Sequence, residues 1–118
     1  MHSCRRVPVA DHLRGKPPQI RAACNALLKA VRRFGPVRIG AVKSRLLISG
    51  RAHFAGVDVR QGRLRIEFLL DRSLESPRVQ RVVRVTDTSF SHFVQASTAA
   101  DVDAQLLGWL KAAYELRR

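Results

Sequence analysis

Apolar residues recur at intervals of three and four positions in the early part of the chain. From Pro17 to Phe34 they form one face of a helix, and basic and amide side chains fill the positions between them. Proline is tolerated in the first helical turn, where its missing N–H is not needed, so Pro17 and Pro18 suit the start of this helix. Gly35 and Pro36 end it. The expected buried face comprises Ile20, Ala23, Cys24, Leu27, Leu28, Val31 and Phe34.

Through the middle of the chain apolar and polar residues alternate instead, which is typical of strands with one buried side. The clearest case is RLRIEFLL at residues 63–70, in which every second residue from Leu64 onward is apolar. A tight hairpin turn is expected at Arg60–Arg63, because Gly62 can adopt a positive φ. The remaining expected strands are residues 37–40, 42–49, 54–59, 79–85 and 91–96.

Helical spacing returns near the end of the chain. Thr98 with Asp101 three residues later is a helix start signal, and an apolar face follows it. The order of elements predicts an α+β fold: a two-layer sandwich with an N-terminal helix, an antiparallel sheet of about five to six strands and a C-terminal helix. Both helices are expected on one side of the sheet. Residues 1–10 are expected to be a loose N-terminal segment, and residues 11–118 a single domain.

This arrangement leaves the other side of the sheet without a covering layer. If Leu46 and Ile48 face the helices, the residues that alternate with them point to the uncovered side, because successive strand residues point in opposite directions. Outward residues of the later strands join them there. The expected cationic set is Lys43, Arg45, Arg63 and Arg65, with Arg84 a further candidate.

The net charge of the chain makes that surface a candidate for binding anions. The sequence of 118 residues has 22 Lys and Arg against 9 Asp and Glu, a net charge of +13, and such an excess attracts polyanions. The basic residues are mostly arginines scattered along the chain, so the base composition of the gene is an alternative explanation. Aromatic residues make up only 6%, which argues against a single-strand platform, because such a platform needs exposed rings on the binding face.

Several functional classes are excluded by what the chain lacks. A frataxin-like iron site needs clustered carboxylates, and no Asp or Glu occurs between Pro17 and Phe34. The histidines and cysteines are too dispersed for zinc, so no metal or cofactor is expected. No apolar run approaches the ~18 residues that cross a bilayer. Without a signal-peptide pattern either, the protein is expected to be cytoplasmic, with no membrane partner.

Short motifs spread over residues 11–115 are together fairly specific. They are Lys43-Ser44, Phe54-Ala55, Ser76-Pro77-Arg78, His92, Trp109 and Ala113-Tyr114. With them the chain resembles a small bacterial family labelled as a domain of unknown function, whose members stand alone or form tails on predicted transport-type or nuclease-like proteins. The helix–sheet–helix outline is also similar to frataxin-like domains and to MmcQ/YjbR-type domains suspected of binding DNA. The resemblance implies a fold and no reaction.

One group of residues could carry chemistry. Lys43 supplies a charge, Ser44 a hydroxyl and His92 a titrating ring, and Arg78 could add a planar fork for an anion. The alternative is that these residues rim the sheet and bond locally. No residue is assigned as catalytic. The candidate anion-binding residues are Lys43, Ser44, Arg45, Arg63, Arg65, Arg78 and His92.

The leading functional hypothesis is a small binding or accessory module for an anionic partner, either nucleic acid or a phosphorylated ligand, held on the open side of the sheet. Two alternatives stay open. One is an enzyme acting on an anionic metabolite at Lys43, Ser44 and His92. The other is a protein–protein module, such as a homodimer formed through the sheet.

Overall fold

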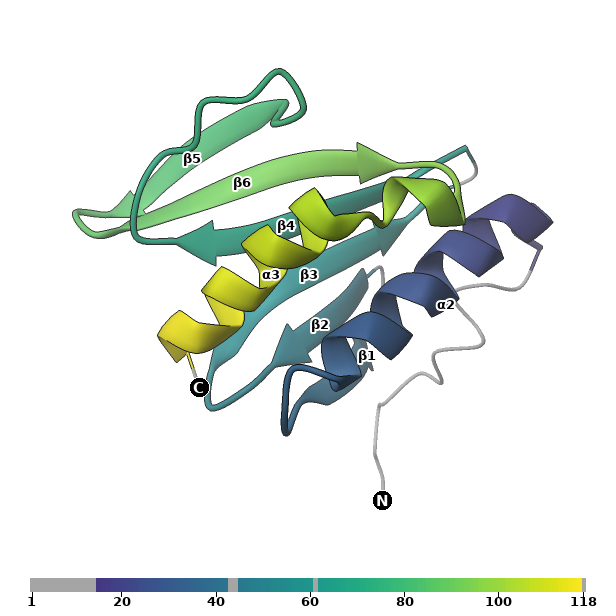
Figure 1. Ribbon diagram of the computed structural model, residues 1–118, viewed down its shortest axis with the longest axis horizontal. Coiled ribbons are helices and arrows are strands. Elements are labelled where there is room, and N and C mark those ends of the chain that lie inside the picture. The colour runs from purple at the N-terminus through teal and green to yellow at the C-terminus, as the bar shows by residue number, and fades with distance from the viewer. Residues whose placement is uncertain (1–14, 43–44, 61, 118) are drawn as a thin grey trace.

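The computed structural model describes residues 15–42, 45–60 and 62–117 (Figure 1). Two α-helices flank the sheet in sequence, α2 (Pro18–Arg32) and α3 (Ala104–Arg117), and a short 3-10 turn, η1 (Ala99–Asp101), precedes α3. The strands are β1 (Arg38–Val42), β2 (Arg45–Ser49), β3 (His53–Val59), β4 (Leu64–Leu70), β5 (Arg81–Thr86) and β6 (Ser89–Ala96).

The six strands form one antiparallel sheet in the order β1-β2-β3-β4-β6-β5. The last hairpin alone departs from chain order, because β6 pairs with β4 and leaves β5 at the edge. Both helices lie on the same side of the sheet, which is the near side in Figure 1. The predicted α+β fold, with one helix before and one after an antiparallel sheet, is confirmed.

The amphipathic first helix packs its apolar face onto the sheet as the spacing predicts. Six of the seven expected residues are buried and the seventh, Phe34, packs partly against the core. Basic residues in the last turn complement the negative end of the helix dipole. Burial raises the pKa of the Cys24 thiol to about 11, so this cysteine acts as a small apolar core residue. The buried residues are Ile20, Ala23, Cys24, Leu27, Leu28 and Val31.

The alternation in β4 is realised without a break. Leu64, Ile66, Phe68 and Leu70 are buried, whereas the residues between them are only partly buried. In β2, Leu46 and Ile48 are also fully buried. The apolar sides of these strands therefore face the helices, and their polar sides face away.

The start of the last helix differs from the prediction, because two capping signals follow one another. The Asp101 carboxylate accepts the backbone N–H groups of Ser97 (2.8 Å) and Thr98 (3.2 Å), and this closes only the short turn η1. Asp103 then caps α3, its Oδ1 accepting the N–H of Leu106 at 3.0 Å. The helix consequently begins at Ala104 rather than directly after Thr98.

The expected position of Arg84 on the open side is wrong. In the β5–β6 pairing Arg84 lies opposite Phe90, and Phe90 lies opposite the buried Leu70 in the β4–β6 pairing. Directly paired residues share a side of the sheet, so Arg84 points to the helix side. Its guanidinium forms an ion pair with Asp87 there, at 2.8 Å. Arg81 and Val83 are the β5 residues on the opposite side.

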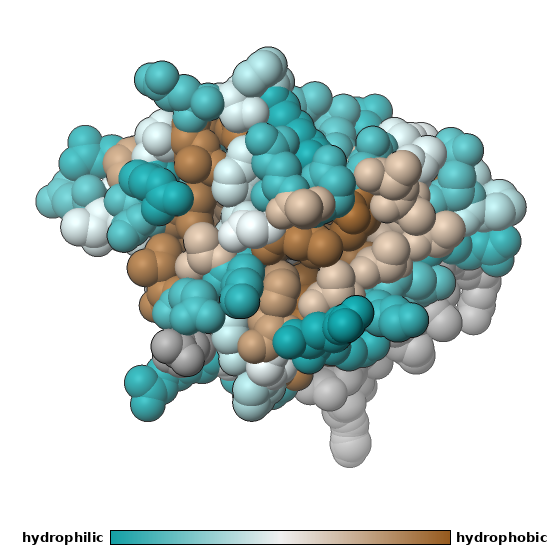
Figure 2. Space-filling model, viewed as in Figure 1, coloured by the Kyte–Doolittle hydropathy of each residue, from teal (hydrophilic) through white to brown (hydrophobic). Residues whose placement is uncertain are grey.

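Strand β5 extends beyond the cover of the helices, because α3 packs mainly on β3 and β4. Val85 (56% exposed) and Leu116 (48% exposed) are large apolar residues at the surface in this region. Figure 2 shows hydrophobic residues reaching the surface on this side, beside the helices. A hollow of about 360 Å³ lies there, lined by Leu69, Leu70, Asp71, Thr88, Ser89 and Leu116. No described helix is both long enough and apolar enough to cross a bilayer.

Candidate functional site

The side of the sheet that faces away from α2 and α3 is called the open face here. Strand pairing assigns its members, because residues directly opposite one another project to the same side. Both helices contact the other side. The members discussed below are Arg38, Arg45, Gly56, Asp58, Arg65, Glu67, Arg81, Ser91, Phe93 and Gln95.

A polar network crosses the middle of the open face. Arg45 on β2 donates through Nη2 to Glu67 Oε1 on β4 at 2.8 Å, and Ser91 on β6 donates to Glu67 Oε2 at 2.7 Å. Burial alone would raise the pKa of Glu67, but the hydrogen bonds from Ser91 and Arg45 and the charge of Arg45 outweigh it and lower that pKa. Glu67 is therefore held as a carboxylate with both oxygens engaged.

Gly56 on β3 lets the Arg45 side chain cross the intervening strand. A Cβ at this position would collide with the Arg45 guanidinium, which lies over the backbone of β3. Along the way Arg45 Nε comes within 3.6 Å of Asp58 Oδ1, and Arg60 approaches the other oxygen of Asp58 at 3.7 Å. The predicted anion-binding residue Arg45 thus lies on the open face with its charge balanced by two carboxylates.

A second group of open-face cations has no such partners. Arg65 Cζ lies over the ring of Phe93, 4.7 Å from its centroid. Arg81 pairs directly with Phe93 from the edge strand β5. Arg63, exposed just before β4, alternates with Leu64 and so shares the side of Arg65. Among the described residues, no carboxylate forms an ion pair with Arg63, Arg65 or Arg81. These three residues are called the arginine cluster.

His92 lies on the other side of the sheet, within the core. It is fully buried, pairs directly with Phe68, and its ring stacks on the Phe68 ring with centroids 5.3 Å apart. Nε2 accepts the backbone N–H of Leu74 at 3.0 Å, so the proton sits on Nδ1, which donates to the Phe90 carbonyl at 3.1 Å. Burial lowers the pKa of His92, although the Phe90 carbonyl opposes this.

The predicted group of Lys43, Ser44 and His92 is therefore described only at its third member. Lys43 and Ser44 lie outside the described residues. Both ring nitrogens of His92 have backbone partners, which is the arrangement of a histidine that holds a loop in place. The sheet separates its ring from Arg45 and Arg65, which project to the open face.

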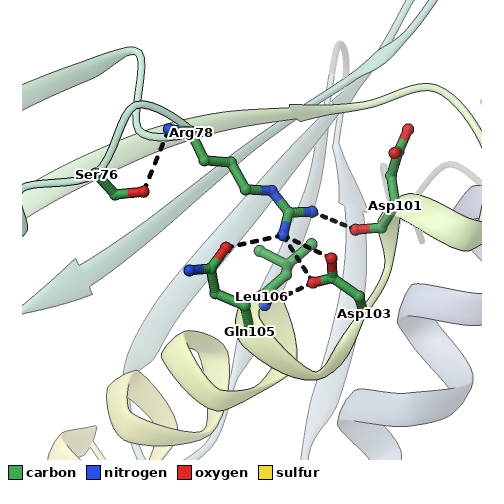
Figure 3. A network of polar contacts seen from close by, with 6 residues as sticks. All are labelled: Ser76, Arg78, Asp101, Asp103, Gln105 and Leu106. Carbon is green, nitrogen blue, oxygen red and sulfur yellow. Dashed lines mark hydrogen bonds and ion pairs between the residues drawn. The ribbon is translucent and has the colours of Figure 1, made fainter.

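Arg78 holds the connection between β4 and β5 against the start of α3 (Figure 3). Its Nη1 donates to both oxygens of Asp103, at 2.7 and 2.9 Å, and to Gln105 Oε1 at 3.2 Å. Its Nη2 donates to the backbone carbonyl of Asp101. Ser76 Oγ accepts the Arg78 N–H at 3.2 Å and shapes the turn that positions the side chain. The guanidinium is thus engaged within the fold.

We expect Arg78→Lys to lower the free energy of unfolding by about 1–3 kcal/mol, because a lysine cannot reproduce the fork of bonds from one planar group. Urea denaturation of both proteins measures the difference. The matched control is Arg72→Lys, since Arg72 and Asp71 form an exposed pair at 3.4 Å and such pairs contribute at most ~1 kcal/mol. Equal effects of the two substitutions would contradict the assigned role of Arg78.

Arg81, Phe93 and Gln95 are open-face residues that the sequence argument did not single out. The alternation of residues 91–96 carries the signal for two of them, because Val94 and Ala96 are buried and the residues before each project outward. Arg81 needed the β5–β6 register, which only the structure supplies. Within the described part of the chain, no three His, Cys, Asp or Glu residues gather in a way that could hold a metal ion.

The described residues form a small two-layer α+β domain with an exposed sheet face. Two helices cover one side of a six-stranded antiparallel sheet, and the other side carries the charged network and the arginine cluster. The sequence profile of the family described as Domain of unknown function (DUF5655) matches residues 9–117, and the chain belongs to this family. No curated protein and no solved structure matches it. The likeness to frataxin-like and MmcQ/YjbR-type domains stays a prediction, as does the bacterial stand-alone or tail context.

Proposed function

We propose that the protein is a binding module for nucleic acid and that the open face carries the interface. The observation that supports this most directly is the arginine cluster of Arg63, Arg65 and Arg81. The two open-face carboxylates described above, Asp58 and Glu67, are both engaged by arginines of the same face. The arginine cluster therefore leaves uncompensated positive charge on the β4–β6–β5 side of this face.

The spread of these cations favours a polymer over a small phosphorylated ligand. Arg65 and Arg81 lie two strand spacings apart, roughly 10 Å at ~4.8 Å per spacing. Arg38, exposed on β1, lies five spacings from Arg81, roughly 24 Å away. One phosphate cannot reach both Arg38 and Arg81 across this distance, whereas a chain of phosphates can contact the open-face arginines in succession. The net charge of +13 adds a field that speeds the encounter with such a chain.

The test compares two triple variants with the same loss of charge. We expect Arg63→Ala/Arg65→Ala/Arg81→Ala to weaken binding to mixed-sequence DNA and RNA on the order of 100-fold at low salt. The slope of log affinity against log salt should also fall by about two to three, since each lost phosphate contact contributes ~0.7–0.9. Fluorescence anisotropy over a salt series measures both quantities.

The control variant is Arg21→Ala/Arg32→Ala/Arg33→Ala, which removes three exposed arginines in and just after α2. It should keep nearly all of the affinity if the open face is the interface. Equal losses of affinity in the two triple variants would show that net charge alone, and not the open face, determines binding. Absence of binding by the unmodified protein at low salt would remove the proposal, because phosphate contacts are strongest there. Lys43→Ala tests the remaining predicted cation in the same assay.

The enzyme alternative has less support. The ring nitrogens of His92 have backbone partners, and no observation favours a reaction at Lys43 and Ser44. The homodimer alternative stays a prediction. Strand β5 pairs on one edge only, and a second copy could pair with the other edge. Size-exclusion chromatography with light scattering over a range of concentrations distinguishes a dimer from a monomer.

A further inference from the structure

We propose that the bound nucleic acid is single-stranded and that one of its unpaired bases stacks on the guanidinium of Arg65. This inference rests on the proposed function and names the form of the partner. It starts from the contact between Arg65 and Phe93, in which the guanidinium carbon lies over the ring at 4.7 Å from the centroid. A planar guanidinium has two faces. In the proposed complex, one face packs on the Phe93 ring and the other receives the base.

The surroundings keep Arg65 on the ring. The carboxylate nearest along its own strand is Glu67, two residues further on, and both of its oxygens are already engaged by Arg45 and Ser91. Two residues lie directly opposite Arg65. Gln95 on β6 is uncharged, and Asp58 on β3 has Arg45 and Arg60 near its two oxygens, at 3.6 and 3.7 Å. Arg65 therefore has no ion pair with a described carboxylate that would draw it away from Phe93. Because Arg45 and Ser91 occupy both oxygens of Glu67, this carboxylate does not compete with Phe93 for Arg65.

A phosphate contact is available on each side of this stack. Arg81 pairs directly with Phe93 from β5, and Arg63 precedes Arg65 by two residues on its own side of the sheet. A strand whose base lies on Arg65 can place neighbouring phosphates near these two cations. A base within a duplex is already paired and stacked, so it cannot reach the guanidinium. The site therefore selects for an unpaired strand.

The stack provides one base subsite. The low aromatic content of the chain argues against a platform of several rings, whereas a single Arg–Phe pair needs only one aromatic residue. Stacking of one base contributes a factor of roughly 5 to 150 in affinity. The remaining affinity comes from phosphates and is shared with duplex DNA.

Arg65→Lys separates stacking from charge, because it keeps the positive charge and removes the planar group. The probes are a labelled single-stranded oligonucleotide of ~10 residues, the duplex of the same sequence, and the single strand with abasic positions. We expect the unmodified protein to prefer the single strand. Arg65→Lys should lose about 5- to 150-fold in affinity for it, with little change in the salt slope or in duplex binding.

Two further variants sharpen the result. Phe93→Leu keeps apolar bulk on β6 but removes the ring, and it should reproduce the effect of Arg65→Lys. Arg21→Lys makes the same change of cation at an exposed position on α2, on the other side of the sheet, and should leave binding unchanged. The unmodified protein should bind the abasic strand about as weakly as Arg65→Lys binds the intact strand. Thermal unfolding of each variant verifies the fold, and Arg65→Lys decides the question if Phe93→Leu is destabilised.

The outcomes separate this inference from the proposed function. If the unmodified protein binds duplex and single strand equally, or if Arg65→Lys binds like the unmodified protein, the stacking site is overturned while nucleic-acid binding stands. If the unmodified protein binds none of the probes at low salt, the proposed function fails and this inference fails with it.

Discussion

Replacing Phe68 by alanine is expected to lower the free energy of unfolding by about 3–5 kcal/mol. Phe68 is fully buried in β4, and its ring stacks with two others. The His92 ring on β6 lies 5.3 Å from it and the Trp109 ring on α3 lies 5.9 Å from it, measured between centroids. The substitution leaves a cavity at the point where both layers of the sandwich meet. Urea and thermal denaturation measure the loss, which should lower Tm by on the order of 10–20 °C.

Two comparisons make this result specific. Phe68→Leu retains most of the buried volume and should cost clearly less than alanine. Val85→Ala removes apolar atoms from a residue that is 56% exposed on the edge strand and should change stability by less than ~0.5 kcal/mol. If Phe68→Ala were as mild as Val85→Ala, the assigned centre of the core would be wrong.

The core and the candidate interface share one strand. Phe68 points to the helices, and Arg65 and Glu67 point to the open face of the same β4. Because side chains alternate along a strand, the burial of one set fixes the direction of the other. Packing beneath the sheet therefore holds the open-face residues at their positions. Core substitutions should accordingly reduce the proposed nucleic-acid binding only as far as they unfold the protein.

Local patterns in the sequence were sufficient for the elements and for the two sides of the sheet. The alternation in residues 63–70 predicted both the buried side of β4 and the outward position of Arg65. The helical spacing from Ile20 to Val31 predicted the buried face of α2. In these cases the burial of a residue follows from its place in the local repeat. Apolar residues recur every two positions along a strand and about every 3.6 positions along a helix.

Contacts between distant residues could not be predicted in this way. Arg78 meets Asp103 because the β4–β5 connection folds back onto the start of α3, and nothing near Arg78 in the sequence indicates it. Arg45 reaches Glu67 across β3, where Gly56 leaves room for its guanidinium. Arg84 was assigned to the wrong side, because the pairing of β5 with β6, rather than its own neighbours, sets its direction. Each case depends on register or on chain reversal.

Lowering the pH from about 7.5 towards 5 is expected to destabilise the protein through His92. Its pKa in the folded state lies below the ordinary value of 6.5, because burial disfavours the charged ring. As the pH falls through 6.5, the unfolded chain therefore takes up this proton before the folded chain does. The free energy of unfolding decreases over that interval and stops responding to His92 once the folded-state pKa is passed.

The geometry shows what protonation would break. A proton added to Nε2 would face the N–H of Leu74, so two donors would oppose one another where a hydrogen bond now holds the β4–β5 connection. The carboxylates of Glu67, Asp101 and Asp103 have pKa values lowered by their partners, so their contributions are lost only at more acidic pH. The interval from pH 7.5 to 5 therefore reports mainly on histidines.

The experiment compares urea denaturation of the unmodified protein and His92→Gln at several pH values in that interval. Glutamine offers an oxygen that can accept the Leu74 N–H but does not titrate. The stability of the His92→Gln protein should therefore depend less on pH than that of the unmodified protein. All other histidines are common to both proteins, so their contributions cancel in the difference. His92→Phe gives a second comparison: it leaves the Leu74 N–H buried without an acceptor and should cost about 1–3 kcal/mol at pH 7.5. Parallel pH profiles for the unmodified protein and His92→Gln would show that His92 is not the group that couples protonation to folding.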